Sequence, residues 1–429
     1  MPKASISDKQ GSFKFILRAL HHKNYRLFFG GQCISLIGTW MQQIAMSWLV
    51  YRLTNSALLL GVVGFSSQIP IFLFASVAGV YADRWNRHRI LVVTQTLSMI
   101  QALTLAFLTL TGNIDVWHII VLSTFLGVIN AFDMPTRQSF IVEIIDKPED
   151  LGNAIALNSF MFNGARLIGP SIAGIIIGYL GEGICFLFNG ISFIGIIIAL
   201  LAMKIPKRKK LLHASRLWQD LRAGYSYAFG FAPIRYILLQ LGVMSFMGMS
   251  YAVLMPIFAR DILHGGPHTL GFLMAASGIG ALTGSIYLAS KRTILGLGRL
   301  IAYSSSIFGI GIIAFSLSEM LIVSLFMMFI AGFGMIVQMA SSNTILQSIV
   351  EEDKRGRVMS IYATAFIGMS PLGNLFAGAI AALIGASATL IMSGATCIIG
   401  SLFFALKLPQ IRKQVRPIYI KMGVISGLE

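Results

Sequence analysis

The sequence predicts an all-α, polytopic membrane protein with twelve transmembrane helices arranged as two parallel six-helix repeats. Three observations predict it: the composition, the number of long apolar stretches, and a repeat in the glycine positions. Of the 429 residues, 56% are hydrophobic and 11% are charged, whereas soluble globular domains carry about 25% charged residues. So little charge is typical of a chain that lies mostly within a bilayer.

Twelve apolar stretches are long enough to cross a membrane, because about 20 helical residues span a hydrocarbon core of about 30 Å. Helices are expected rather than a barrel, since the stretches lack the short alternating pattern of barrel strands. The expected spans are approximately residues 26–51, 57–80, 90–111, 117–141, 153–180, 184–203, 234–258, 269–289, 299–317, 321–345, 358–384 and 386–406.

The basic residues indicate the orientation of these spans. The net charge of +17 could suggest a nucleic-acid partner. With the N-terminus in the cytoplasm, however, all but four of the 33 Lys and Arg fall on the cytoplasmic side. This is the positive-inside distribution of membrane proteins. We therefore expect both termini in the cytoplasm and membrane lipid, not nucleic acid, next to the basic segments.

The longest polar stretch separates six spans from the other six. The expected parts are a basic cytoplasmic segment with an interfacial helix over 12–23 (1–25), a first six-helix bundle (26–203), a basic cytoplasmic linker (204–233), a second six-helix bundle (234–406) and a cytoplasmic tail (407–429).

Glycine positions repeat between the two bundles. An offset of 204 residues pairs five glycines with five others: Gly164 with Gly368, Gly169 with Gly373, Gly174 with Gly378, Gly181 with Gly385, and Gly190 with Gly394. Six spans separate the copies, so both start on the same side of the membrane. The repeat is then parallel, with its axis along the membrane normal and a central cavity between the bundles.

The sequence offers little for an enzyme or a cofactor site. Cys33, Cys185 and Cys397 lie inside predicted helices, so no disulfide or metal cluster is expected. The seven His are scattered without ligand spacing. No phosphate-binding loop and no nucleophile with a neighbouring base occur. We expect no enzymatic activity, no cofactor and no metal.

One cytoplasmic loop concentrates charge. The stretch "GVYADRWNRHRI", residues 79–90, resembles the loop 2–3 signature G-x-x-x-D-R-x-G-R-R of the major facilitator superfamily, matching at Gly79, Asp83, Arg84 and Arg87. Asn86 replaces the second glycine, and Asn is the next residue best able to adopt a left-handed turn.

A second motif lies in the fifth span. "GARLIGPSIAG" begins at Gly164 and resembles the helix-5 signature G-x-x-x-G-P-x-x-G-G of the antiporter branches at Gly169, Pro170 and Gly174. Close helix packing through small residues is sufficient to explain most of its glycines.

The chain resembles the major facilitator superfamily over essentially its whole length. Its amino-acid sequence is similar to the sequences of exporters related to the enterobactin exporter and the macrolide efflux pumps. The resemblance implies a protein of the bacterial inner membrane that works by alternating access. Ser123 stands where many proton-coupled members have an arginine, so that coupling residue cannot be carried over.

The resemblance places Asp83 opposite the start of the eleventh helix, whose N-terminus favours a carboxylate. Arg355 and Arg357 are further partners there. We expect this contact to latch the two bundles shut on the cytoplasmic side. The alternative is a solvated loop that only sets topology.

Three charges lie deeper. Asp133 and Arg137 are four residues apart in the fourth span, and Arg166 is at similar depth in the fifth. A charge at mid-bilayer costs about 2.5–3.5 kcal/mol on insertion scales and usually faces a cavity or a partner. We expect Asp133 to pair with Arg166, with Arg137 as the alternative partner, and leave open whether Asp133 carries protons or is a structural ion pair.

Polar stripes mark the helices that line the substrate path in the family, namely helices 1, 4, 7 and 10. The expected cavity residues are Gln32, Ser35, Thr39, Gln42, Asn130, Gln240 and Gln338.

The first hypothesis is a monomeric secondary exporter of a small molecule, driven by proton entry. The basic pair Arg137 and Arg166 favours an anionic or catecholate substrate and hence a siderophore, while a drug or macrolide pump of the same fold is the alternative. Import is left open. A hypothesis of another class is a non-transporting membrane sensor or assembly platform.

Overall fold

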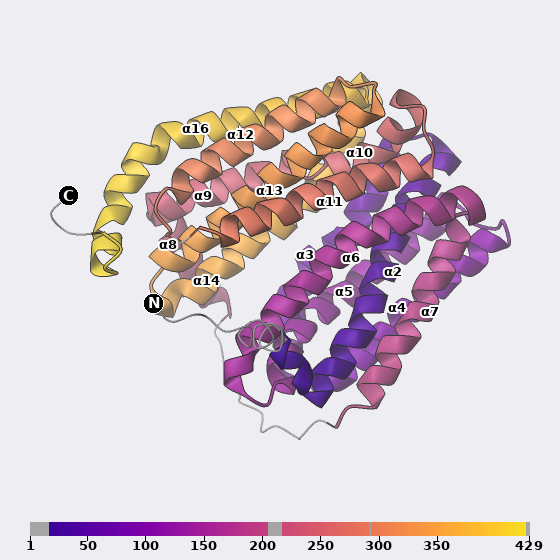
Figure 1. Cartoon of the computed structure of the whole chain (residues 1–429), viewed down its shortest axis with the longest axis horizontal. Helices are drawn as coiled ribbons and strands as arrows, with labels where there is room; N and C mark the ends of the chain where they lie inside the picture. Colours follow the sequence, from indigo (N-terminus) through magenta and orange to yellow (C-terminus); the bar gives the residue numbers. More distant parts are fainter. Residues whose placement is uncertain (1–16, 205–216, 292, 426–429) are drawn as a thin grey trace, which may run out of the picture. The chain divides into compact units, whose positions relative to one another are not determined.

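The computed structural model describes residues 17–204, 217–291 and 293–425, and within them the chain forms helices and no strand (Figure 1). Twelve helical segments among them are long and apolar enough to cross a membrane. This confirms the predicted fold class. The first six are α2 (Lys23–Thr54), α3 (Ala57–Arg84), α4 (Arg87–Leu110), α5 (Val116–Ile144), α6 (Leu151–Leu180) and α7 (Glu182–Leu201).

The other six spans include two that are built from several pieces. These pieces are α9 (Ala232–Val243), η3 (Met244–Gly248), α10 (Tyr251–Ile257) and η4 (Phe258–Ile262) in the seventh span, and α14 (Glu352–Ala363), η5 (Thr364–Gly368) and α15 (Met369–Ile384) in the eleventh. The single helices are α11 (Pro267–Ala289), α12 (Leu297–Ser316), α13 (Leu321–Ile349) and α16 (Ala386–Lys421). A shorter helix, α8 (Leu217–Gly230), precedes the seventh span.

The chain divides into two compact units. Unit 1 is Met1–Met46 with Leu73–Leu212, and unit 2 is Ser47–Phe72 with His213–Glu429. The end of α2 and most of α3 thus pack with the second half of the chain. Glycines make this packing close: a Cβ at Gly61 of α3 would lie 2.9 Å from the Cα of Gly378 in α15. Gly378 is one of the repeat glycines.

Unit 1 is held together by an apolar cluster near the start of α2. Tyr25 and Phe28 of α2 are buried with Phe140 of α5, and α4 packs against both α5 and α7. Of the predicted interfacial helix over 12–23, residues 12–16 lie outside the described part, and the first described element is η1 (Arg18–His21), a single 3-10 turn. Residues 205–216 of the predicted linker also lie outside it.

Unit 2 has an apolar core around the end of α16, which runs on to Lys421, well beyond the predicted span end at 406. Leu408, Ile411 and Val415 are buried in the same cluster as Phe404. Their spacing of three to four residues continues one apolar face of the helix. Figure 1 shows this extension of α16 past α12, the helix it packs against.

Two spans of unit 2 change helical geometry near their middle. The π-helical segments η3 and η5 interrupt the seventh and eleventh spans. The Ser245 hydroxyl of η3 donates to the Phe366 carbonyl of η5, and a Cβ at Gly373 would collide with the carbonyl of Phe246. Because such bulges in helices are often found at functional positions, these two spans can bend here.

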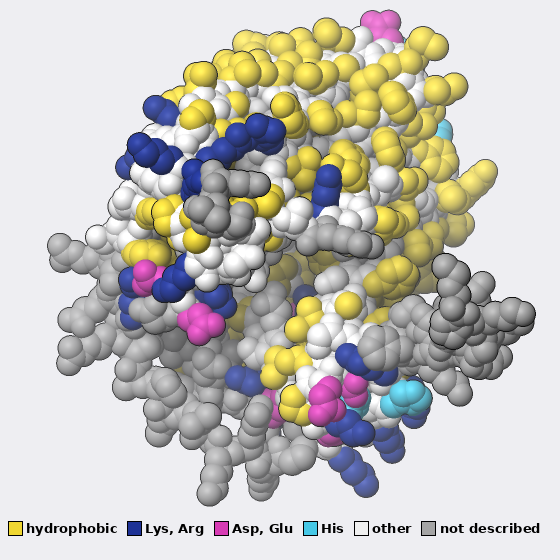
Figure 2. Space-filling view, turned by 60° about the vertical axis from the view of Figure 1, so that its left-hand side comes forward, with side chains coloured by type: hydrophobic (Ala, Val, Ile, Leu, Met, Phe, Trp, Pro, Cys, Tyr) yellow, Lys and Arg dark blue, Asp and Glu magenta, His cyan; other side chains and the backbone are white. Residues whose placement is uncertain are grey.

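The surface agrees with a lipid environment. Figure 2 shows hydrophobic side chains over the upper part of the view, with Lys and Arg gathered at its left and lower sides. Large apolar side chains are widely exposed, among them Phe107, Phe160, Ile322 and Leu383. Contiguous apolar surface on this scale is unfavourable in water.

Candidate functional site

The centre of unit 1 contains a buried carboxylate, Asp133, on α5. Its side chain is 3% exposed. The Thr94 hydroxyl donates to Oδ1 over 2.9 Å and Gln95 Nε2 donates to the same oxygen over 2.8 Å. Arg137 Nη2 lies 3.4 Å from Oδ2. The group is therefore buried with three donors, the condition under which a protein interior tolerates a carboxylate.

Local sequence explains this arrangement. Asp133 and Arg137 are one helical turn apart, so they share a face of α5. Thr94 and Gln95 are adjacent on α4, which packs against α5. Pro135 lies between the two charged residues and has no N–H to donate, which weakens the helix at this point.

The expected pairing of Asp133 with Arg166 is wrong in this structure. The ion pair is with Arg137, whereas the Arg166 guanidinium lies 5.9 Å from the centre of the Trp40 ring on α2. Similar depth does not make neighbours: Arg166 faces α2, and Asp133 faces α4. Sequence spacing gives depth along a helix but not the rotation of one helix against another.

Trp40 is held in place by α6. A Cβ at Gly169 would lie 2.5 Å from the Trp40 Cβ and 3.0 Å from the carbonyl of Ile37. Phe162 meets the Trp40 ring edge-on at 5.8 Å between centroids. The ring is therefore fixed from two directions by one neighbouring helix.

The rest of the helix-5 motif divides in two. Gly169, Pro170 and Gly174 are buried, while a Cβ at Gly164 would meet open space. Gly169 is thus the member of the motif that sets the distance between α6 and α2.

The polar stripe of α2 lies mostly inside unit 1. Gln42 donates to Gln101 of α4 over 3.0 Å and accepts from Asn189 of α7 over 2.8 Å. Gln32 and Ser35 are also buried. Thr39 is exposed. A polar side chain within a span first satisfies its own hydrogen bonds, so Gln42 acts here as a tie between three helices.

The remaining cavity candidates lie apart in this structure. Asn130 of α5 is half-buried. In unit 2, Gln240 of α9 and Gln338 of α13 are buried, and Gln338 donates to Ser342 over 3.3 Å. Their role as cavity residues stays a prediction.

The loop 2–3 motif is described only in part. The side chains of Asp83 and Arg84 lie outside the described residues, so the cytoplasmic latch stays a prediction. Gly79 is half-buried with open space at its Cβ position. Arg87 Nη1 lies 3.6 Å from Glu143 Oε2 of α5, an ion pair within unit 1.

The expectation for Asn86 is wrong. Its φ is −73°, so it does not adopt a left-handed turn. It is instead the N-cap of α4, and its side chain accepts from the Arg89 N–H over 3.0 Å. Asn is among the best N-cap residues because its carbonyl satisfies a free N–H of the first turn.

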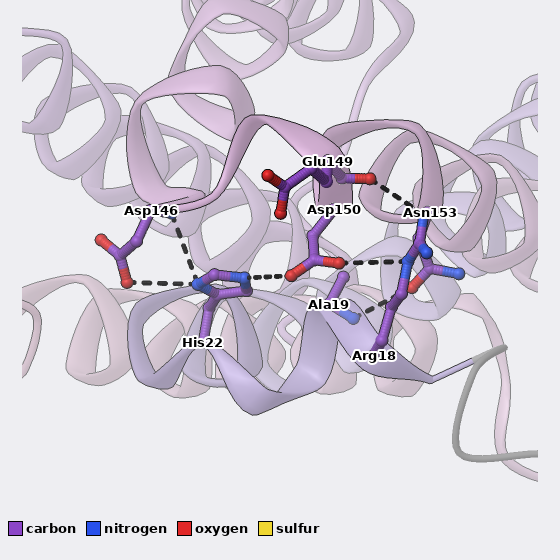
Figure 3. Close-up of polar contacts among 7 residues, drawn as sticks. All are labelled: Arg18, Ala19, His22, Asp146, Glu149, Asp150 and Asn153. Atoms are coloured by element: carbon purple, nitrogen blue, oxygen red, sulfur yellow. Dashed lines mark hydrogen bonds and ion pairs between the residues drawn. The ribbon is translucent and has the colours of Figure 1, made fainter. Parts of the chain in front are cut away.

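A charged cluster at the start of α2 was not predicted from the sequence (Figure 3). His22 is 8% exposed, and its ring nitrogens lie 3.1 Å from Asp146 Oδ2 and 2.9 Å from Asp150 Oδ2. Arg18 Nε lies 3.1 Å from the other oxygen of Asp150. Two carboxylates four residues apart, after a basic N-terminal stretch, were the available signal.

The same cluster is tied to the backbone on both sides. Arg18 donates to the Glu149 carbonyl over 2.9 Å, and the Ala19 N–H donates to Asn153 over 3.0 Å. Burial alone would lower the pKa of His22. The hydrogen bonds and charges of Asp150 and Asp146 outweigh it, so the pKa is raised above its ordinary value of 6.5.

Unit 2 has a polar cluster of its own at the α2–α3 turn. The Tyr51 hydroxyl donates to Asp261. Arg260 Nη1 donates to Asn55 Oδ1 over 2.7 Å, and its guanidinium lies 5.7 Å from the centre of the Tyr51 ring. These contacts join the end of α2 to η4.

Solved structures show which class of protein this fold defines. A bacterial homologue of the human lysosomal transporter Spinster, crystallised in an inward-facing, occupied conformation, superposes with a TM-score of 0.70 at 15% identity, over 91% of this chain and 97% of that one. The chain therefore has the fold of a major facilitator transporter.

The family follows from the sequence comparison. The model described as transmembrane secretion effector matches residues 16–419, so the chain belongs to that family of major facilitator transporters. Among curated relatives, the staphyloferrin A transporter of Staphylococcus aureus is 27% identical, covering 88% of this chain and 95% of the relative. The multidrug efflux pump Tap of Mycolicibacterium fortuitum is 24% identical, covering 88% and 90%. The protein is an integral membrane transporter of the secretion and efflux type.

Proposed function

We propose that this protein is a proton-driven exporter of an anionic siderophore in the bacterial inner membrane, working by alternating access. It acts as a monomer with both termini in the cytoplasm and has no enzymatic activity. The observation that carries the proposal is Asp133, a carboxylate buried at mid-span with its donors already in place.

Asp133 is suited to proton coupling because it is the acid that lies well inside a described span. Among the described spans, the other acids lie in the last or first turns, as Glu143 of α5 and Glu182 of α7 do. Arg137 lies within ion-pair distance of this carboxylate, and a proton bound there would remove the charge that holds the pair. One group can thereby couple proton entry to a rearrangement of α4 and α5.

The energy is sufficient. Moving one charge through the membrane potential releases about 2.3 kcal/mol per 100 mV. At a total force of about 180 mV one proton supplies about 4 kcal/mol, which supports nearly a thousandfold gradient of a neutral substrate.

The nature of the substrate is supported by charge and by similarity. Two basic side chains, those of Arg137 and Arg166, lie within the spans of unit 1. The similarity to the staphyloferrin A transporter supports a siderophore.

Gating involves both ends of the path. On the cytoplasmic side, the Asp83 motif closes the inward opening. At the α2–α3 turn, the hydrogen bonds of Tyr51 with Asp261 and of Asn55 with Arg260 must break before substrate leaves on the outer side.

The test uses proteoliposomes that contain the purified protein and are loaded with staphyloferrin A. The pH gradient and the potential are imposed separately. We expect efflux that rises with either component and exceeds that of protein-free liposomes. Efflux indifferent to both, after subtraction of leak, contradicts proton coupling and leaves facilitated diffusion.

Multidrug export is the second candidate, favoured by the similarity to Tap over nearly the whole chain. The same vesicles loaded with a macrolide distinguish multidrug export from siderophore export, since a drug pump moves the macrolide and not the siderophore. A sensor or assembly platform moves neither compound.

A further inference from the structure

Arg166 is a charged side chain near the middle of a transmembrane helix with no ion pair among the described residues. It lies about 22 Å from either end of α6, at 1.5 Å per residue. Its side chain cannot reach the membrane surface from there. A charge at this depth requires a polar path or a counter-charge.

Among the residues whose side chains the structure describes, no acid is left over to balance Arg166. The sequence has 16 Asp and Glu. Of the spans that the structure describes, only α5 has an acid well away from its ends, Asp133, and that side chain is taken by Arg137, Thr94 and Gln95. An anion from outside the chain can supply the negative charge that the described residues do not.

The surroundings of Arg166 orient it for such a partner. Trp40 lies within cation–π distance of the guanidinium, at 5.9 Å. Phe162 packs edge-on against Trp40, and Gly169 lets α6 approach closely enough to hold that ring. The N–H edge of a guanidinium that lies over an aromatic ring can still donate hydrogen bonds, and this planar edge matches two oxygens side by side.

We infer that Arg166, positioned by Trp40 and Phe162, forms an anion subsite that binds a group with two adjacent oxygens on the transported molecule. A carboxylate and a catecholate both present such a pair. This inference rests on the proposed function for its ligand, and it assigns the two arginines different tasks. Arg137 neutralises Asp133, and Arg166 binds substrate.

The experiment measures binding to the full chain in lipid nanodiscs by calorimetry. Two probes separate the sources of the oxygen pair: citrate, which has carboxylates alone, and 2,3-dihydroxybenzoate, which adds a catechol. The trimethyl ester of citrate serves as the uncharged control. The variants are Arg166→Gln, Arg166→Lys, Trp40→Phe and, as a matched loss of one exposed positive charge, Arg299→Gln.

We expect the wild type to bind at least one anion and not the ester. Arg166→Gln should weaken binding about ten- to a hundredfold, the range for hydrogen bonds to charged groups. Arg166→Lys should weaken it less, since it keeps the charge and loses the two-pronged geometry. Trp40→Phe should fall between wild type and Arg166→Gln, and Arg299→Gln should match wild type.

Equal affinity of Arg166→Gln and wild type overturns the subsite, as does a wild type that binds neither anion. Arg166→Lys keeps the test valid if Arg166→Gln fails to fold. The outcome is separable from proton coupling: affinity lost in Arg166→Gln with gradient-independent efflux supports the subsite and contradicts the proposed function. Gradient-driven efflux by the wild type, with the same anion affinity in Arg166→Gln as in wild type, supports the proposed function and contradicts the subsite.

Discussion

At the scale of single residues, the charged side chains within the spans of unit 1 differ in the helices that they contact. Asp133 is matched within its own helix by Arg137 and across to α4 by Thr94 and Gln95. Arg166, at similar depth, faces an aromatic ring instead. The two charged side chains therefore have different surroundings, a set of hydrogen-bond donors for Asp133 and an aromatic ring for Arg166.

The first prediction concerns the ion pair. Asp133→Asn should abolish most gradient-driven export and lower the melting temperature, because it leaves the Arg137 side chain, which is 20% exposed, within the span without its counter-charge. Arg137→Gln in the same chain should restore part of the stability but not the coupling. Thermal melting and vesicle efflux measure the two effects.

The matched double mutant is Asp133→Asn with Arg166→Gln. It should show no recovery of stability, since Arg166 does not contact Asp133. Recovery with Arg166→Gln rather than with Arg137→Gln would contradict the pairing of Asp133 with Arg137.

The second prediction concerns His22 and pH. Because its pKa in the folded protein is raised above 6.5, the stability it contributes is fully present below about pH 6.5. That stability is lost as pH rises through the folded pKa. The melting temperature of wild type relative to His22→Asn should therefore be highest below about pH 6.5 and decline as the pH rises through the folded pKa of His22.

His21→Asn is the control for His22, since His21 is adjacent and exposed. A pH dependence in His22→Asn identical to that of wild type would exclude the cluster with Asp146 and Asp150 as its source.

At the scale of elements, helix contacts in this chain depend on where glycine stands. Gly169 brings α6 against α2, and Gly373, its partner in the repeat, brings α15 against η3. In a membrane there is little hydrophobic drive between helices, so close backbone approach and dispersion forces carry the association. The two members of a repeat pair thus do the same job in different units.

The third prediction separates two glycines of one motif. Gly169→Ala should destabilise the protein, because the added methyl overlaps Trp40, and overpacking costs about 1–3 kcal/mol. Gly164→Ala should be neutral or slightly stabilising, because its Cβ enters open space and Ala favours the helix. Melting temperatures of the two variants in the same detergent decide this. Equal losses would contradict a packing role specific to Gly169.

At the scale of the whole molecule, the division into units does not follow the predicted halves. Ser47–Phe72 belongs with the second half of the chain, joined to it by Gly61 against Gly378 and by the polar cluster of Tyr51 and Asp261. Transport by alternating access requires contacts of this kind to form and break in turn.

The fourth prediction concerns the proposed cytoplasmic gate at Asp83. Asp83→Asn should keep expression and membrane insertion but lose most export, because the inward opening no longer closes. The control is Glu319→Gln, an exposed acid in the α12–α13 connection, which should transport normally. Normal export by Asp83→Asn would contradict the latch and favour the alternative, a solvated loop that only sets topology.

Much of this molecule could be predicted without coordinates, for a physical reason. A bilayer admits few backbone solutions, so the length and apolarity of the twelve stretches suffice to predict helices, and the glycine offset suffices to predict a repeat. The rarity of acids within spans likewise singled out Asp133. These features depend on composition and on position along one helix.

Which side chains meet was decided only by tertiary packing. Because of the rotation of α6, Arg166 lies next to Trp40. Asp133 instead contacts Arg137, Thr94 and Gln95. Gln42, predicted to face a cavity, became a tie to Gln101 and Asn189. His22 found two carboxylates more than a hundred residues away along the chain. Helical periodicity specifies depth and face within a helix, whereas the neighbour of that face depends on how every other helix packs, which no local pattern encodes.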